Sequence, residues 1–165
     1  MAEATSIYLN TWRAYNNGSV GYGWMSAKEA GDFIRKNPER DGGEWFIADI
    51  DNYLGIQISS CDYCNVMEVI ESIRLLEELD EYEQREVIAL MEHLNTNSAK
   101  KAIEKKDNYT FYQDIEVYHD FMDELISEQM DNNNILARYF DYEAYHRDCD
   151  IDINEMSNGV CIALY

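Results

Sequence analysis

Apolar and polar residues alternate in several short runs of the first third of the chain, which is the pattern of half-buried strands. The predicted strands cover residues 6–12, 20–25 and 44–50. Ser26 is placed to cap a short helix that ends near Lys36, before the single proline of the chain. The N-terminal part is therefore expected to be a small β-sheet with a short helix.

Further along the chain, apolar residues recur at steps of three or four, which indicates amphipathic helices. Residues 66–94 predict two helices, with Asp80 as the N-cap of the second. A longer helix is predicted over residues 115–130 with Asp114 as its N-cap. Its apolar side chains are expected to face inward: Ile115, Tyr118, Phe121, Met122, Leu125 and Ile126.

The last segments predict a strand over 109–112, a helix over 135–145 and a strand over 160–164. The fold class is therefore α+β. The charge balance changes near residue 62 and near residue 106, and these positions are the expected boundaries. The expected organisation is an N-terminal α+β subdomain, a central helical subdomain and a C-terminal α+β subdomain, over residues 1–62, 63–106 and 107–165.

Charge is the unusual feature of this chain of 165 residues, because 33 Asp and Glu face 13 Lys and Arg and leave a net charge of −20. Such a field repels nucleic acid and anionic lipid, so neither is an expected partner. There is no apolar run of about 18 residues and no visible secretory signal, and four cysteines in this context are expected to be reduced thiols. A cytoplasmic protein is expected.

Acidic residues gather on helix faces where bases are absent. Residues 107–137 carry eight acids and neither Lys nor Arg. On the predicted helix the acids lie opposite the apolar arc, at about one charge per 4–5 Å given the 1.5 Å rise, and a second row is predicted on the first central helix. The two rows are Glu116, Asp120, Asp123, Glu124 and Asp131, and Glu68, Glu71 and Glu78.

Charge alone leaves several interpretations of these rows open. Duplex DNA carries one phosphate per about 1.7 Å of axis, so a row of carboxylates resembles a diluted phosphate track. A solvated helix face, weak cation binding and attraction to another basic partner explain the same pattern. Lys100, Lys101, Lys105 and Lys106 interrupt the acidic sequence, and their role is not evident from the sequence.

Motifs that carry catalytic or metal chemistry are incomplete. Cys61-x-x-Cys64 lacks the second pair of ligands that a zinc site needs. Asp148-x-Asp150-x-Asp152 has Ile153 where a calcium loop needs glycine. The three histidines are scattered, and no nucleophile or phosphate-loop motif is present. We therefore expect no cofactor, no metal and no enzymatic activity, although a carboxylate pair acting as acid and base remains an alternative.

Three segments in conserved order resemble the ArdA-type antirestriction proteins. Residues 7–24 contain Ile-Tyr-Leu-Asn, a Tyr-Asn-x-Gly turn and Gly-x-Gly-Trp; residues 75–94 contain Leu-Leu-Glu-Glu-Leu and Ala-Leu-Met-Glu-His-Leu. The most specific segment is Asp-Tyr-Glu-Ala-Tyr-His-Arg-Asp-x-Asp-Ile at 141–151. The chain differs from the family pattern at Cys61–Cys64 and at Lys100–Lys106.

The resemblance implies an elongated α+β homodimer of small subdomains, encoded on a mobile genetic element and acting in the host cytoplasm. Proteins of this type mimic DNA and occupy the DNA-binding groove of the methyltransferase core of type I restriction-modification enzymes. The two helix rows are then the first candidates for the partner-binding carboxylates. Second candidates are Asp141, Asp148, Asp150 and Asp152. The alternative is an acidic inhibitor of another basic nucleic-acid-binding protein.

Overall fold

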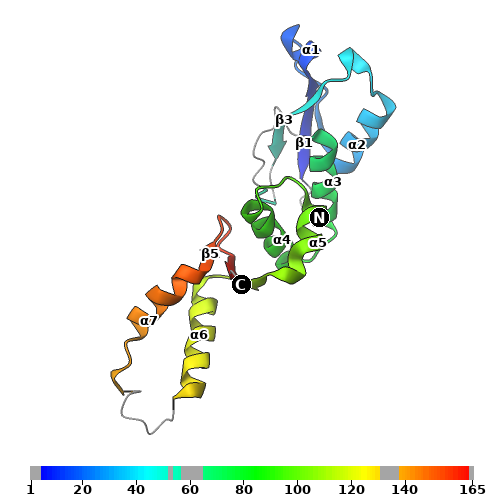
Figure 1. Cartoon of the computed structure of the whole chain (residues 1–165). Helices are drawn as coiled ribbons and strands as arrows, with labels where there is room; N and C mark the ends of the chain where they lie inside the picture. The colour runs from blue at the N-terminus through cyan, green and yellow to red at the C-terminus, as the bar shows by residue number, and fades with distance from the viewer. Residues whose placement is uncertain (1–4, 52–53, 57–64, 131–137, 164–165) are drawn as a thin grey trace. The chain divides into compact units, whose positions relative to one another are not determined.

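The computed structural model describes residues 5–51, 54–56, 65–130 and 138–163. The chain folds as two compact units, Met1–Glu104 and Lys105–Tyr165, which we call the N-terminal and C-terminal units (Figure 1). Both units combine helices with a three-stranded sheet, which confirms the α+β class. The predicted division into three subdomains stays a prediction.

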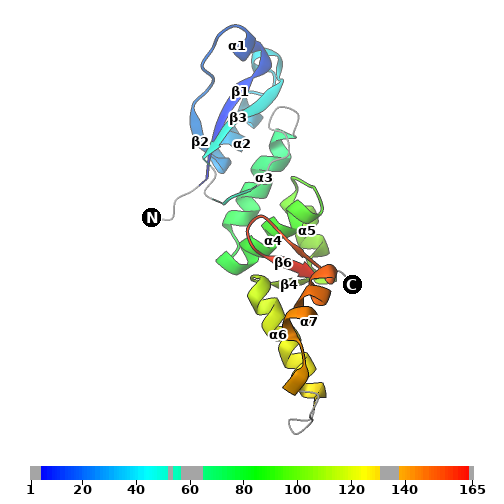
Figure 2. The same cartoon turned by 90° about the vertical axis from the view of Figure 1, so that its left-hand side faces the viewer.

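The N-terminal unit begins with an antiparallel sheet of order β2–β1–β3, formed by β1 Ser6–Thr11, β2 Trp24–Ser26 and β3 Trp45–Asp51. Ile7 and Leu9 alternate along β1 and are fully buried, as is Ile47 of β3. Helix α2, Ala27–Lys36, packs against this sheet and against the first of the central helices, α3 Val66–Glu77 (Figure 2). The predicted cap of α2 is confirmed, because Ser26 and Glu29 form a reciprocal capping box.

The central helices are α3 Val66–Glu77, α4 Glu81–His93 and α5 Ala99–Lys105. The predicted apolar stripe of α3 is buried, with Ile73 and Leu76 fully enclosed. Of the stripe predicted on the second helix, Val87, Ile88 and Met91 are buried, whereas Leu94, which follows the end of α4, is half-buried. Asp80 caps α4 by accepting the Glu83 N–H at 2.9 Å. Helix α5 was not predicted, because its sequence is dominated by lysines and carries only a short apolar pattern.

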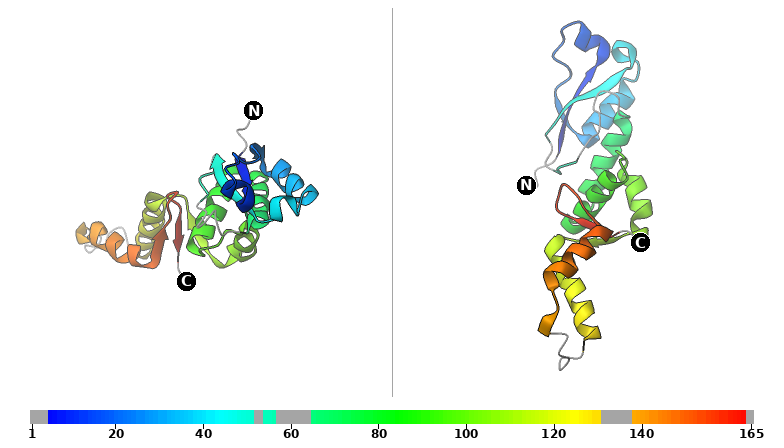
Figure 3. Two further views of the ribbon diagram at one scale, coloured as in Figure 1. Left: turned by 90° about the horizontal axis from the view of Figure 1, so that it is seen from above. Right: turned by 60° about the vertical axis from the view of Figure 1, so that its left-hand side comes forward.

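The C-terminal unit contains a sheet of order β4–β6–β5, made of β4 Thr110–Tyr112, β5 Ile153–Glu155 and β6 Cys161–Ala163. Helix α6, Ile115–Gln129, lies beside α7, Tyr142–Cys149 (Figure 3). The core of this unit is formed by Tyr112, Tyr118, Cys149, Ile153, Cys161 and Ala163. Asp114 caps α6 as predicted, accepting the Val117 N–H at 2.8 Å.

Three sequence predictions need correction. The strand predicted over 20–25 is only β2, because Gly21 and Gly23 adopt left-handed φ angles that interrupt an extended chain. The helix predicted over 135–145 begins only at Tyr142, where Asp141 provides the N-cap; residues 131–137 lie outside the described residues. On α6, Tyr118 is buried, but Phe121 and Leu125 are 40% and 37% exposed rather than inward-facing.

Short elements escaped prediction. Trp12–Asn16 forms the five-residue helix α1, and short 3-10 turns lie at Arg40–Gly42, Lys106–Asn108 and Asp150–Asp152. Strand β5 was also missed. Elements of three to five residues carry too few positions for a period to be recognised.

Gly21→Ala should destabilise the N-terminal unit more than Gly18→Ala. Both glycines have positive φ. A Cβ at Gly21 would lie 2.8 Å from Tyr8 Cε1 and 2.9 Å from the Leu9 carbonyl oxygen, whereas a Cβ at Gly18 would have no neighbouring atom within 4 Å. Backbone strain costs about 1–3 kcal/mol at such a position, and the steric clash adds to it at Gly21. Urea unfolding of both variants measures the difference; equal midpoints would contradict the close packing of β1 against this loop.

Candidate partner-binding surface

Helix α6 presents an unbroken line of exposed carboxylates. Glu116, Asp120, Glu124 and Glu128 follow one another at steps of four residues, and all four are exposed. Steps of four place them on one side of the helix, about 6 Å apart along its axis. The row predicted from the sequence contains the first three but not Glu128, although Glu128 continues the same step of four. We call these four residues the α6 row.

Two other predicted acids of this region have a different status. Asp123 is half-buried, and its Oδ1 lies 2.7 Å from Nε2 of His146 on α7. Asp131 lies outside the described residues. Asp123 therefore belongs to the contact between α6 and α7 rather than to the exposed row.

The contact between α6 and α7 is built around two stacked histidines. The rings of His119 and His146 are 4.0 Å apart and nearly parallel, at 7°. His119 Nε2 lies 2.6 Å from Asp150 Oδ1, so each imidazole has its own carboxylate partner on a different element. The two Asp–His pairs hold α6 and α7 together and commit Asp123 and Asp150 to this contact.

Of the other predicted acids of the C-terminal unit, one caps a helix and two are exposed on the surface. Asp141 caps α7 by accepting the Ala144 N–H at 3.0 Å. Asp148 and Asp152 are exposed at the end of α7 and in the following 3-10 turn. In the part of the chain that the structure describes, no group of three or more His, Cys, Asp or Glu side chains could hold a metal ion.

The row predicted on α3 is interrupted by basic side chains. Glu68 Oε1 lies 3.1 Å from Lys101 Nζ of α5, and both side chains keep substantial exposure. Glu71 is exposed but shares a surface hollow of about 440 Å³ with Glu68, Lys100 and Lys101. Glu78 is the C-cap residue of α3. The local field at α3 is therefore weaker than the sequence of acids suggests.

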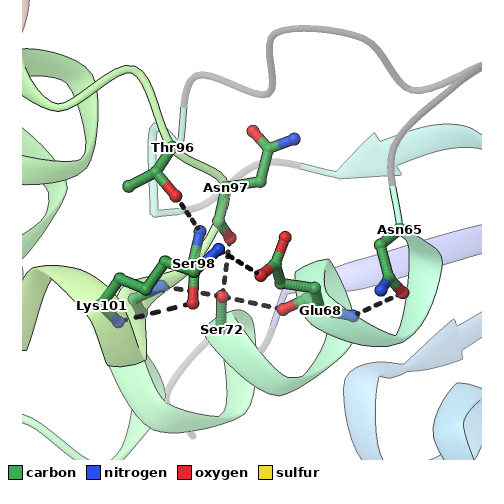
Figure 4. Close-up of polar contacts among 8 residues, drawn as sticks. Asn65, Glu68, Ser72, Thr96, Asn97, Ser98 and Lys101 are labelled. Atoms are coloured by element: carbon green, nitrogen blue, oxygen red, sulfur yellow. Dashed lines mark hydrogen bonds and ion pairs between the residues drawn. The ribbon is translucent and has the colours of Figure 1, made fainter.

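Ser72 fixes the lysine-bearing helix in this position (Figure 4). The single proton of its hydroxyl is shared between the carbonyl oxygens of Glu68, at 2.8 Å from Oγ, and Asn97, at 2.7 Å, and Oγ accepts the Ala99 N–H at 2.9 Å. Ser72 is only 3% exposed. These bonds anchor the start of α5 on α3, which brings Lys101 to Glu68. The lysine cluster therefore lies partly against the predicted acidic row.

The described cysteines are structural rather than reactive. Cys149 and Cys161 are free and buried, and Cys61 and Cys64 lie outside the described residues. Burial, with the nearby Glu155 charge as a smaller cause, raises the pKa of the Cys161 thiol to about 11. Burial also raises the pKa of Cys149. Thiolate chemistry at these two positions is suppressed at neutral pH.

In a Cys61→Ser/Cys64→Ser variant, iodoacetamide at pH 8 should label the native protein slowly. With a pKa of about 11, only about one thousandth of the Cys161 thiol is ionised at that pH, and burial adds a barrier to access. Labelling in urea should be faster by about two orders of magnitude. Mass spectrometry of both reactions provides the check, and rapid labelling of the native protein would contradict the buried location.

These features are typical of an acidic protein that binds a basic partner. The described residues carry an exposed acidic row and structural pairs, and no helix among them is long and apolar enough to cross a membrane. Such a surface suits the binding of a basic partner.

Comparison with known families then identifies the group. The family model described as "Antirestriction protein (ArdA)" matches residues 7–161, and the chain belongs to this family. ArdA antirestriction proteins are non-enzymatic inhibitors of type I restriction enzymes, which confirms the resemblance seen in the sequence. A search of curated proteins finds no similar sequence.

Proposed function

We propose that this protein inhibits its type I restriction-modification target by mimicking DNA, with the α6 row lying in the DNA-binding groove of the methyltransferase core. The single observation that carries the proposal is the exposed row Glu116, Asp120, Glu124 and Glu128 on a helix that contains neither Lys nor Arg. Like charges at steps of four destabilise a helix slightly, so the row is costly for folding. A basic groove relieves that repulsion.

The spacing of the row supports partial mimicry of one DNA strand. The carboxylates are about 6 Å apart along the helix axis, whereas one strand of duplex DNA places a phosphate every 3.4 Å of axis. The α6 row alone therefore offers about half the charge density of one strand. Asp148, Asp152, Glu71 and Glu78 are the further exposed acids that we propose to contribute, while Asp123, Asp141, Asp150 and Glu68 act mainly through the internal contacts described above.

We further propose that the protein acts in the cytoplasm of the host, where the restriction enzyme meets incoming DNA, and that it is a homodimer. An apolar line on α6, Val117, Phe121 and Leu125, is 45%, 40% and 37% exposed and runs beside the acidic row. Because these side chains follow the same step of four, a second copy related by a two-fold axis can cover them.

The dimer predicts a clear effect of one substitution. Val117→Ser removes an apolar side chain that is 45% exposed in the single chain, so it should leave the fold intact while shifting the mass in solution toward the monomer. Light scattering after gel filtration measures the mass. A wild-type protein that is monomeric at high concentration would contradict the homodimer.

A competition experiment tests the inhibitory mechanism. Labelled duplex DNA bound to a purified type I methyltransferase core is titrated with the wild-type protein at low and moderate salt. Displacement that weakens as salt rises is the expected result, because both ligands neutralise the same basic groove. If DNA stays bound while the enzyme is still inhibited, groove occupation is wrong and the protein acts elsewhere on the enzyme. Equal binding to unrelated basic DNA-binding proteins would favour a general acidic inhibitor.

A further inference from the structure

The N-terminal sheet has a face that bears aromatic and acidic side chains in register. Tyr8 of β1 lies opposite Trp24 of β2 and Asp49 of β3, and Ser6 lies opposite Asp51, two residues further along β3. Residues directly opposite in an antiparallel sheet project from the same face, and so do residues two apart on one strand. All five side chains therefore share one face, while Ile7, on the other face, is completely buried.

This face forms an open hollow of about 440 Å³, lined by Ser6, Trp24, Asp49, Ile50 and Asp51. We call it the Trp24 hollow. Trp24 is 51% exposed, which is unusual for so large an apolar side chain. Asp49 and Asp51 are also exposed, and within the described ranges neither forms an ion pair with a Lys or Arg side chain. The hollow thus combines an accessible indole with two carboxylates.

The Trp24 indole packs against the ring of Tyr8 on the neighbouring strand. The rings of Tyr8 and Trp24 meet edge to face with centroids 5.3 Å apart. The Tyr8 hydroxyl donates to the Val20 carbonyl oxygen, and the loop at Gly21 lies close against the Tyr8 ring. Trp24 therefore presents a supported surface rather than a freely rotating side chain, which lowers the entropy lost when a ligand binds.

The chemistry of the hollow suits a guanidinium group. An arginine side chain stacks on an indole face and donates paired hydrogen bonds to carboxylates. A guanidinium group is also more weakly hydrated than an ammonium group, so removing it from water costs less than removing a lysine. Two carboxylates beside the ring disfavour a nucleotide, because its phosphate would be repelled. We propose that the Trp24 hollow receives an arginine side chain of the protein partner. The identity of that partner rests on the proposed function, whereas the guanidinium chemistry does not.

Peptide binding followed by NMR tests the hollow directly. The probes are acetyl-Gly-Arg-Gly-amide and the matched lysine peptide, and the readout is the Trp24 indole N–H resonance, assigned with Trp24→Phe. The arginine peptide should shift this resonance saturably and bind several-fold more tightly than the lysine peptide. The isosteric pair Asp49→Asn/Asp51→Asn should weaken binding by roughly tenfold or more, because the charge-assisted hydrogen bonds are lost.

The matched control is Glu39→Gln/Glu44→Gln, which removes the same charge from exposed positions of the same unit. It should leave peptide binding nearly unchanged. An equal loss in this control, equal binding of the lysine peptide or an unshifted Trp24 resonance would each overturn the proposal, since only general charge attraction would then remain. Trp24→Ala should weaken binding of the arginine peptide by about 3- to 30-fold through loss of the cation–π contact.

A displacement assay separates this inference from the proposed function. In the DNA competition described above, Asp49→Asn/Asp51→Asn should displace DNA less effectively than Glu39→Gln/Glu44→Gln. If both pairs match the wild type while a variant with the four acids of the α6 row replaced by their amides fails, DNA mimicry stands and the arginine does not come from this enzyme, which overturns the partner assigned to the hollow. If the wild type itself fails to displace DNA, the proposed function is overturned and the peptide titration alone decides the hollow.

Discussion

Replacing the four acids of the α6 row by their amides should weaken the binding of the type I methyltransferase core on the order of 30-fold. Each exposed carboxylate contributes little through solvent, but four such contacts add up to this factor. The dependence of binding on salt should also become less steep, because fewer counterions are released. Titration of the enzyme with the quadruple variant at several salt concentrations measures both effects. The changes are Glu116→Gln, Asp120→Asn, Glu124→Gln and Glu128→Gln.

The control for this variant carries the same net charge but keeps the α6 row. Four exposed acids elsewhere are replaced by amides: Glu39, Glu44, Glu83 and Asp107. This control should bind within a few-fold of the wild type. Equal weakening by both variants would mean that total charge alone drives binding. A single amide substitution in the row that abolished inhibition without unfolding the protein would contradict a distributed contact.

Ser72→Ala should lower the stability of the N-terminal unit by about 3 kcal/mol. The substitution removes one donated proton, shared by two carbonyl oxygens, and one accepted hydrogen bond, and it leaves the Ala99 N–H and the Asn97 carbonyl without this partner. A buried polar group without a partner costs about 1–3 kcal/mol. Thermal unfolding followed by circular dichroism should show a midpoint lower by several degrees.

Ser127→Ala, an exposed serine on α6, is the control for the change in helix propensity and should be neutral or slightly stabilising. If Ser72→Ala were equally harmless, α5 would not depend on this hydroxyl. The structure also predicts a secondary effect, because a loosened α5 no longer holds Lys101 beside Glu68. Ser72→Ala should therefore differ from the wild type in the salt dependence of its binding to the methyltransferase core as well as in stability.

Helical periodicity predicted the exposed acids of α6 only in part. The sequence placed Glu116, Asp120, Asp123 and Glu124 together, because helical periodicity puts them on neighbouring parts of one surface. Three of them are exposed, but Asp123 is paired with His146, which lies 23 positions away in the chain. The same holds for Asp150 and His119, 31 positions apart. A spacing rule along one helix contains no information about a partner on another helix.

Local signals predicted the longer elements well. The N-caps at Ser26, Asp80 and Asp114 were readable because each cap side chain satisfies a backbone N–H three positions ahead. Segments without such signals were placed less well: β2 is shorter than expected, and α7 begins later than expected. Both errors occur where glycine conformation or a cap overrides a weak apolar pattern.

The sequence by itself determined the α+β class, the main helices with their caps, the acidic character and the family to which the chain belongs. These depend on periodicity, local hydrogen bonds and composition, which are properties of neighbouring residues. Only the tertiary structure decided which carboxylates are exposed and which are paired, how Ser72 joins α5 to α3, and that Trp24 shares a face with Asp49 and Asp51. Those facts depend on strand register and helix packing, which bring together residues far apart in the chain.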